Sequence, residues 1–462
     1  MTEATLIIKN GCIVTMNSER EIYSVGAIAI REDRIIAVGN NDAITSSYNA
    51  PDTIDAGGYM IIPGFIDGHN HPSTYFIGGL ADDIDIRHML QTYFYPYDAY
   101  ITDEEGYTAS TASYIEMLRS GVTCFNDPGG YCPDSVAQAA VDIGIRGIVS
   151  RSTRDMCEGL PEKLVEDVDT NLRESERVIK KWNGAADGRI RAWCGVRMPI
   201  TASDDLLVNI RDLAQQNGVG IHTHASTVDW ENKFSESKWG KRTLARYRDL
   251  GLLKSNLYTV HMGDVTDEEI TWLKKEDVKV AHCCAAASMA GAGIIRGRRI
   301  PAIMKGGVTM SLGSDGGYLS GNHDFFRLMY LCASLHREWL DDPAAVGAHK
   351  AFEMATIDGA RACLWDDEIG SLETGKKADV VLVDRSGPEW NYPNRDPIRN
   401  LVYSANHNCV DTVIIDGRVV MKGREIQTID EEENKANVTE TGKKWMERGN
   451  IPPVSREAWP IL

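Results

Sequence analysis

The sequence predicts an α/β protein: a (β/α)8 TIM barrel with a small β-sandwich domain formed from both chain ends. Three observations support this. In the middle of the chain, strand-length apolar runs alternate with amphipathic stretches, the pattern of a parallel sheet covered by helices. Eight such runs are present, enough to close a barrel. Both chain ends instead carry short apolar–polar alternations separated by turn residues, which predicts a separate β domain.

The β domain is expected to combine residues 1–60 with residues 371–428. Near the N-terminus the alternating runs include Leu6–Ile8, Ala27–Ile30 and Arg34–Val38. A similar texture returns at Ala378–Val383 and Asp411–Met421. Residues 429–462 are charged and helix-prone, so we expect a helical tail packed on the outside of the molecule.

The barrel is expected to span residues 61–370. Its strands are predicted at Ile61–Asp67, Gly121–Phe125, Gly144–Val149, Ile190–Val196, Gly218–His222, Leu257–Val260, Val278–Ala281 and Val308–Leu312. Amphipathic stretches between several of these runs predict helices at Asp103–Ser120, Leu160–Lys181 and Asp204–Gln216.

Composition disfavours several classes of function. Acidic residues outnumber basic ones, 67 to 49, and the net charge of −18 disfavours a general binder of nucleic acid or of an anionic membrane. No run approaches the roughly 18 apolar residues of a membrane span, and the N-terminus lacks the features of a signal peptide. Ten cysteines without a secretion signal indicate reduced thiols. We therefore expect a cytoplasmic protein whose partner is a small molecule.

Histidines and one aspartate follow the predicted barrel strands. His69 and His71 close the first strand, and their i, i+2 spacing points both side chains the same way. Later strand ends carry His224, His261, His282 and Asp315. The C-terminal ends of barrel strands form the active-site mouth, so these side chains should meet there. Imidazole and carboxylate groups together suit a divalent metal such as zinc.

The chain resembles the amidohydrolase superfamily of metal-dependent hydrolases, in the branch of deaminases and triazine hydrolases. The resemblance covers nearly the whole chain and is carried by Pro63–His71, His224-Ala225, His261 and Leu312–Gly316. It implies a catalytic barrel that uses a metal-activated water. Family likeness also suggests a homo-oligomer.

Carried over by residue, the resemblance implies that His69, His71, His224 and Asp315 bind one divalent metal. Zinc is favoured, and iron, cobalt and manganese stay open because such a ligand set accepts all of them. The resemblance further implies that Asp315 transfers protons and that His261 hydrogen-bonds the nucleophile or the substrate oxygen. The fourth strand lacks the lysine that bridges two metals in other branches, so a single metal is expected.

The fifth strand departs from the deaminase pattern. Deaminases of this branch have His-x-x-Glu there, and the Glu protonates a ring nitrogen of the substrate. This chain has His224-Ala-Ser-Thr227, and a hydroxyl is not an acid at neutral pH. We therefore expect cleavage of a small neutral amide, urea, carbamate or thiocarbamate, as in the phenylurea and thiocarbamate hydrolases that degrade xenobiotic herbicides. Replacement of the missing acid by Glu231 or Asp229 is an open alternative.

Two further functions remain open. One is an aminohydrolase of a purine, pterin or s-triazine ring, which would release ammonia. The other is a non-catalytic binding or assembly protein, which the complete ligand set disfavours. The substrate pocket is expected to include Tyr93, Arg197, Thr227, His282 and Asn322. For Arg197, a structural salt bridge is the competing interpretation, and for Tyr93 the competing interpretation is a helix packed on the barrel.

Overall fold

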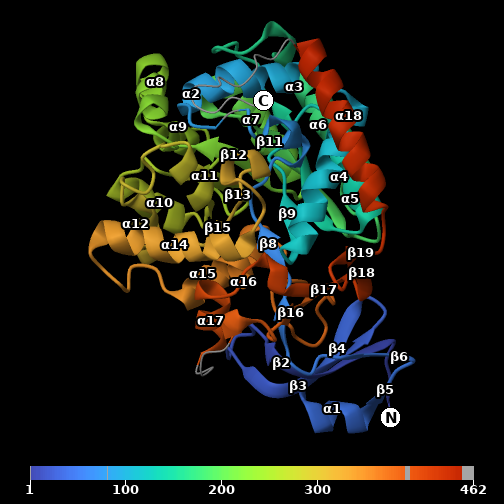
Figure 1. Cartoon of the computed structure of the whole chain (residues 1–462). Helices are drawn as coiled ribbons and strands as arrows, with labels where there is room; N and C mark the ends of the chain where they lie inside the picture. The colour runs from blue at the N-terminus through green and yellow to red at the C-terminus, as the bar shows by residue number, and fades with distance from the viewer. Residues whose placement is uncertain (1, 81, 391–395, 450–462) are drawn as a thin grey trace, which may run out of the picture.

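The computed structural model describes residues 2–80, 82–390 and 396–449. Eight parallel strands form a barrel, and a mixed sheet built from both chain ends lies beneath it (Figure 1). The predicted fold class is therefore confirmed, with the smaller unit formed mainly by one mixed sheet. None of the helices within the described residues has the length and apolar character needed to cross a bilayer.

The barrel strands pair in chain order. They are β8 (Phe65–Asp67), β9 (Val122–Asn126), β10 (Arg146–Thr153), β11 (Ile190–Val196), β12 (Ile221–Ala225), β13 (Leu257–His261), β14 (Lys279–His282) and β15 (Met310–Leu312). The last strand returns to the first: Gly68 N–H donates to the Leu312 carbonyl at 2.9 Å, and Asp315 N–H donates to the His69 carbonyl at 2.9 Å. The closed ring brings all strand ends to one rim.

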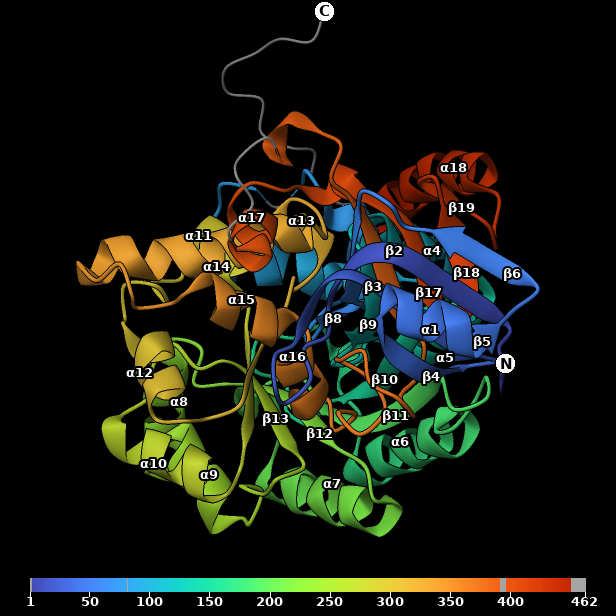
Figure 2. The same cartoon turned by 90° about the horizontal axis from the view of Figure 1, so that it is seen from below.

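Helices surround this ring, as the view from below shows for α6, α7, α9 and α10 (Figure 2). The helices that follow β8 to β11 are α2 (Ile86–Met89), α3 (Tyr95–Tyr100), α4 (Asp103–Arg119), α5 (Pro133–Ile143), α6 (Val168–Trp182) and α7 (Asp204–Asn217). A π-helical turn at Leu90–Phe94 joins α2 to α3. The remaining barrel helices are α8 (Asp229–Trp239), α9 (Thr243–Asp249), α10 (Asp267–Lys275), α11 (Cys284–Met289), α12 (Arg299–Lys305), α13 (Gly317–Ser320), α14 (Phe325–Leu340), α15 (Ala348–Ala355) and α16 (Ile357–Ala362).

Capping side chains set where these helices begin. Helix α4 starts at a reciprocal capping box in which the side chains of Thr102 and Glu105 each bond the other's backbone N–H. Helix α6 starts at Val168, not at Leu160 as the amphipathic pattern predicts. Asp167 caps it by accepting a hydrogen bond from Thr170 N–H at 2.6 Å, and this local cap outweighs the longer apolar period.

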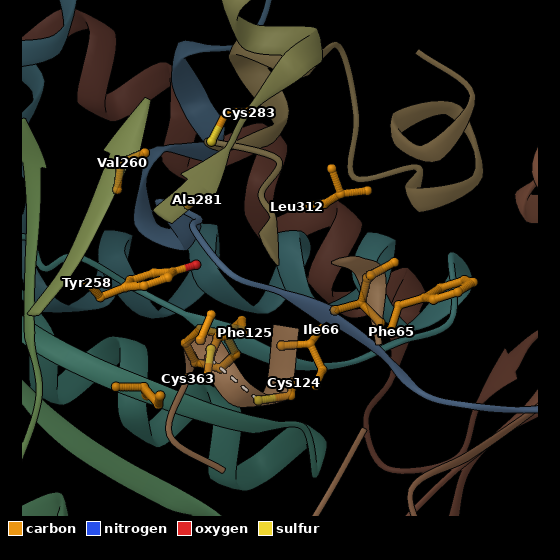
Figure 3. Packing of buried hydrophobic residues seen from close by; sticks show 14 of the residues in the cluster. Phe65, Ile66, Cys124, Phe125, Tyr258, Val260, Ala281, Cys283, Leu312 and Cys363 are labelled. Atoms are coloured by element: carbon orange, nitrogen blue, oxygen red, sulfur yellow. Dashed lines mark hydrogen bonds between the residues drawn. The ribbon is translucent and has the colours of Figure 1, made fainter. Parts of the chain in front are cut away.

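Aromatic side chains pack the first barrel strand against the helices outside it. Phe65 lies 5.8 Å from Phe325, 5.4 Å from Phe326 and 6.2 Å from Phe352, measured between ring centroids. Figure 3 shows Phe65 among other buried side chains of the barrel strands, including Phe125. Close packing of this kind makes the barrel a stiff support for the rim above it.

The predicted first strand, Ile61–Asp67, is in fact two strands in two sheets. Residues Tyr59–Pro63 form β7 in the lower sheet, and the barrel strand β8 begins only at Phe65. Gly64 joins them, and its N–H donates to the Asp379 carbonyl at 3.1 Å. A side chain at position 64 would bring its Cβ to 1.9 Å from Thr123 Oγ1, so the chain can change sheets here only as glycine.

The lower sheet joins both ends of the chain at β7. Strand β7 is parallel to β2 (Leu6–Val14) from the N-terminal part and antiparallel to β16 (Val380–Asp384) from the C-terminal part. The other strands of the lower sheet extend to either side of β7. They are β2 (Leu6–Val14), β3 (Ile22–Arg31), β4 (Arg34–Asn40), β6 (Asp52–Asp55), β16 (Val380–Asp384), β17 (Val410–Ile415), β18 (Arg418–Lys422) and β19 (Glu425–Ile426), while β1 (Thr2–Glu3) and β5 (Tyr48–Asn49) form a separate pair.

Within the part of the chain that the structure describes, three helices lie outside the barrel helices. They are α1 (Asn41–Ser47), α17 (Pro397–Tyr403) and α18 (Glu431–Gly449). Helix α18 lies along α4 (Figure 1) and buries Trp445 against Tyr97, with 4.7 Å between ring centroids. It falls within the predicted tail, of which residues 450–462 lie outside the described residues.

Candidate metal centre

Four barrel strands deliver histidines and an aspartate to one point of the rim. His69 and His71 follow β8, and His224 lies in β12. His261 ends β13 with a φ of 75°, and Asp315 follows β15 with a φ of 62°. These left-handed conformations are costly for residues other than glycine, and such strain gathers at functional sites.

The side chains converge closely. One ligand atom from each of His69, His224, His261 and Asp315 lies within 4.8 Å of the others. The Nε2 atom of His69 is 3.0 Å from Asp315 Oδ1, and that of His71 is 3.5 Å from the same oxygen. The ring of His71 also stacks on that of His224 with an angle of 3° between the planes. This close group thus holds three of the four predicted ligands together with His261, and His71 lies beside it, 3.5 Å from Asp315 Oδ1.

Burial keeps these imidazoles in the form that binds metals. Loss of hydration lowers the pKa of His69, His71 and His224 well below its usual range, and the nearby Arg197 charge adds to this. Burial also lowers the pKa of His261 to about 4. A neutral imidazole nitrogen is a metal ligand, whereas a protonated one is not. The donor set of imidazoles and one carboxylate therefore fits a zinc-like divalent ion.

A second layer of hydrogen bonds orients the rings. His69 Nδ1 is 3.0 Å from His222 Nε2, and His222 Nδ1 is 3.0 Å from Asn126 Oδ1. His224 Nδ1 is 2.9 Å from the carbonyl oxygen of Arg197. Partners of this kind fix the tautomer and direction of a ligating histidine. The sequence alone indicates no role for His222 or for Asn126.

Asp67 ties the first and last barrel strands together below the cluster. Its carboxylate accepts hydrogen bonds from Ser314 N–H at 2.9 Å, from Ser314 Oγ at 2.6 Å and from Asn70 Nδ2 at 3.0 Å. His69 and Asp315 are close neighbours of these residues in the chain, so the network fixes their positions. Asp67 belongs to the Pro63–His71 motif, but the sequence alone predicts no role for it.

A small cavity of about 50 Å³ opens directly over the cluster. Its apolar wall includes Met89, Leu90 and Leu319. Arg197 and Thr227, both predicted to contact substrate, also line it. The structure therefore places these two side chains beside the candidate metal ligands.

The other three predicted substrate contacts lie outside the lining of this cavity. The ring of Tyr93 lies against that of His88, with 6.5 Å between centroids. Within the same π-helical turn, Leu90 lines the cavity and Tyr93 does not. His282 Nε2 is 3.0 Å from His336 Nε2. Asn322 Oδ1 accepts a hydrogen bond from Asp324 N–H at 3.2 Å and so belongs to a local turn.

Neither acid considered as a replacement for the missing Glu reaches the cavity. Glu231 is fully buried, and its carboxylate accepts hydrogen bonds from Ser226 N–H at 2.6 Å, from Thr227 N–H at 3.2 Å and from Thr243 Oγ1 at 3.1 Å. Asp229 is exposed and pairs with Lys233 at 2.5 Å. Glu231 thus holds the turn that carries Thr227. At position 227, where deaminases of this branch have the Glu, this chain offers only a hydroxyl.

Comparison with known proteins agrees with this geometry. The sequence profile of the Amidohydrolase family matches residues 60–420. The chain belongs to the amidohydrolase family. It is 32% identical to a 5-methylthioadenosine/S-adenosylhomocysteine deaminase of Thermoanaerobacter pseudethanolicus, over 96% of this chain and 100% of that protein. It is likewise 32% identical to a 5'-deoxyadenosine deaminase of Methanobrevibacter smithii, over 94% of this chain and 96% of that protein.

Solved structures place this amidohydrolase among zinc-binding relatives. An adenosine deaminase from Xanthomonas campestris with bound zinc superposes with a TM-score of 0.89 at 27% identity, covering 97% of this chain and 99% of that one. An atrazine chlorohydrolase from Arthrobacter aurescens superposes with a TM-score of 0.86 at 21% identity, covering 95% of this chain and 100% of that one, which shows a shared fold alone. The chain is thus a metal-dependent hydrolase of carbon–nitrogen bonds with a His/His/His/Asp metal site. These comparisons lend no support to the expected degradation of herbicides.

Proposed function

We propose that this amidohydrolase is an aminohydrolase that removes the exocyclic amino group of a purine nucleoside. The observation that carries the proposal is the similarity to deaminases of 5'-substituted adenosines over nearly the whole of both chains. The relation covers the barrel and the lower sheet alike. An aminohydrolase of a purine ring is an alternative that the sequence leaves open, and here it takes precedence over the amide or urea hydrolase that Thr227 led us to expect.

In the proposed site, His69, His71, His224 and Asp315 hold one divalent ion, zinc by preference, with His261 beside it. Such an ion supplies Lewis acidity, which lowers the pKa of water to about 7 and polarises the substrate. The Asp315 carboxylate lies 3.7 Å from His261 Nε2, which places it to accept a proton from the nucleophile and return it to the leaving amine. His261 is neutral near pH 7, because its pKa is about 4, so it acts as a hydrogen-bond donor or acceptor.

The cavity wall adds exclusion of water. Met89, Leu90 and Leu319 cover the reacting centre with apolar surface. In such surroundings the charge on Asp315 and the dipole of His261 act through a lower effective dielectric than in water.

A second candidate function is hydrolysis of a neutral amide, urea or carbamate. Thr227 favours it, because its hydroxyl replaces the acid expected in a deaminase. A carbonyl substrate needs no ring protonation.

A substrate panel tests both candidates. The zinc-loaded protein is incubated with adenosine, 5'-deoxyadenosine, 5-methylthioadenosine and S-adenosylhomocysteine, and in parallel with an aryl urea and an aryl carbamate. Ammonia release and the ultraviolet shift of the purine are expected with at least one nucleoside. Hydrolysis of the urea or carbamate, with no ammonia from any nucleoside, would select the second candidate instead. Size-exclusion chromatography of the same sample tests the predicted homo-oligomer.

A further inference from the structure

Arg197 carries a buried charge without a carboxylate partner. It follows β11, and only 4% of its surface is exposed. None of the ion pairs within the described residues includes it, although these pairs reach separations of 4.0 Å, and its Nε has no hydrogen-bond partner there. A buried guanidinium without a counter-charge is costly, so a negative charge that forms beside it in the cavity is stabilised.

The guanidinium of Arg197 lies between the imidazole of His71, a predicted metal ligand, and the ring of Phe94. Its Nη1 lies 3.4 Å from His71 Nδ1 and 3.5 Å from His71 Nε2. Its Cζ lies 4.3 Å from the centroid of the Phe94 ring. The side chain is therefore fixed beside the cluster, and it lines the same cavity as Thr227 and Asp315.

The acids that face Arg197 do not neutralise it. Asp127, which follows β9, feels its charge, but burial raises the pKa of Asp127 and so disfavours its charged form, and no ion pair within the described residues joins it to Arg197. Asp315 also feels the charge, yet it faces His69, His71 and His261 at 3.0 to 3.7 Å and is committed to the metal cluster. The field of Arg197 is thus directed into the cavity.

We propose that Arg197 stabilises the anionic adduct formed when water adds to the ring of the substrate, in place of a proton supplied from position 227. This inference rests on the proposed deaminase function and explains how the chemistry proceeds with Thr227. An arginine remains charged at any working pH and does not give up a proton. It therefore acts as a fixed positive charge.

The step balances without a further reactant. An O–H bond of water breaks, its proton goes to Asp315, and the oxygen bonds the amino-bearing ring carbon. The π electron pair of the C=N bond moves onto the ring nitrogen, and the negative charge there pairs with the Arg197 guanidinium. The pair then re-forms C=N while the C–NH2 bond breaks, and the amine takes the proton from Asp315 and leaves as ammonia. The product is the hydroxyl tautomer of the oxo-heterocycle.

The test compares variants of Arg197 in the zinc-loaded protein. Arg197→Met removes the charge and should lower kcat for nucleoside deamination by about 100-fold or more, as loss of a transition-state donor does. Arg197→Lys keeps the charge and should stay within about 30-fold of wild type. Zinc content and the melting temperature are measured for each variant, since a residue with only a structural role would change these first.

Arg87 provides the matched control. It lies over the ring of Trp230 at 4.6 Å, as Arg197 lies over Phe94, but it does not line the metal cavity. Arg87→Met should leave kcat within about threefold of wild type, because it removes a cation–aromatic contact without changing the charge over the cluster.

Restoring the acid gives an independent readout. Thr227→Glu introduced into the Arg197→Met variant returns a proton donor to the motif position, so kcat should rise at least about tenfold above that of Arg197→Met alone. A structural role for Arg197 predicts no such recovery.

Each outcome decides. Ammonia from the wild type together with a folded, zinc-loaded Arg197→Met of near-normal kcat overturns the role of Arg197 and leaves the proposed function standing. No ammonia from the wild type with any nucleoside sinks the proposed function itself. If Arg197→Met fails to fold or to bind zinc, Arg197→Lys decides: a kcat within about 30-fold supports the proposal, and a larger fall in a folded, zinc-loaded protein refutes it.

Discussion

At the scale of single residues, the ligands of the candidate metal site were predictable and their supports were not. His69, His71 and Asp315 stand at strand ends, where the topology of a barrel alone dictates that side chains meet. The hydrogen bonds from His222 to His69 and to Asn126 join positions that are remote in the chain. No spacing rule relates such positions, so only the folded structure reveals them.

Asp315 is expected to be indispensable. Asp315→Asn removes the proton acceptor, and kcat should fall by at least about 100-fold to 10,000-fold, the range for loss of a general acid–base group. Zinc analysis of the same sample separates lost proton transfer, with zinc retained, from lost ligation. Turnover close to wild type would refute both roles. Asp229→Asn is the control, since Asp229 is an exposed carboxylate on α8 with 67% of its side chain accessible.

Glu231 lies in the first turn of α8 but is fully buried, so its loss should lower the free energy of unfolding more than loss of an exposed helix residue. Glu231→Ala leaves the N–H groups of Ser226 and Thr227 without their acceptor, which should lower the free energy of unfolding by about 1–3 kcal/mol. Urea unfolding measures this. Asp229→Ala, two positions earlier, removes only an exposed ion pair and should cost less than about 1 kcal/mol. Equal costs for the two variants would contradict the buried role of Glu231.

Asp127 should make stability depend on pH. Burial raises its pKa in the folded state to about 8, above the unfolded value, so the folded protein binds the proton more tightly. The stability that protonated Asp127 contributes is complete at a pH below its unfolded pKa. As the pH rises from there towards about 8, the free energy of unfolding falls by at most about 1.4 kcal/mol per pH unit. Asp127→Asn should therefore gain stability relative to wild type as pH rises from about 5 to about 8. A difference between the two that does not change with pH in urea unfolding would argue against this.

At the scale of elements, the sequence located helices and strands well but missed where one strand changes sheets. The apolar run at Ile61–Asp67 reads as continuous because apolar side chains suit both the lower sheet and the barrel. The break depends on Gly64, whose close approach to Thr123 involves a segment about 60 residues away. The π-helical turn at Leu90–Phe94, which turns Leu90 rather than Tyr93 towards the cavity, was equally hidden from periodicity.

Gly64 should tolerate no side chain. In Gly64→Ala the new Cβ would sit 1.9 Å from Thr123 Oγ1, so the strands must separate, at a cost of at least about 1–3 kcal/mol in unfolding free energy. Gly39→Ala in β4 is the matched control, because its nearest neighbour would be Ile44 Cδ1 at 3.6 Å, an ordinary contact. Denaturation midpoints compare the two. A Gly64→Ala protein as stable as Gly39→Ala would mean that the junction has room that the structure does not show.

At the scale of the whole molecule, buried charges join the barrel to the lower sheet. Arg146 at the start of β10 makes a bidentate contact with Asp379, at 2.7 and 3.0 Å, and also bonds Asp416. Asp379 directly precedes β16 and Asp416 directly follows β17, so both acids belong to the C-terminal part of the lower sheet. Replacing the arginine alone, or the two aspartates alone, would leave a buried charge unpaired, which is strongly destabilising. These contacts therefore hold the barrel and the lower sheet together.

The overall fold and the class of chemistry followed from sequence because they depend on repeated patterns. The alternation of strand and helix repeats eight times along the sequence, and a metal-ligand type of side chain follows several of the strands. The substrate was not predictable in the same way, because it depends on a few side chains. Thr227 alone suggested a carbonyl compound, whereas the structure sets Thr227 beside the unpaired charge of Arg197, and the full-length relatives are deaminases.

A zinc titration tests the central claim most directly. Metal-free protein is mixed with increasing zinc, and ammonia release from a purine nucleoside is followed at each ratio. The rate should rise linearly and level off at one zinc per chain, because His69, His71, His224 and Asp315 form a single buried cluster. Ammonia formation that is indifferent to zinc, or that levels off only at two zinc ions per chain, would contradict a single-metal aminohydrolase.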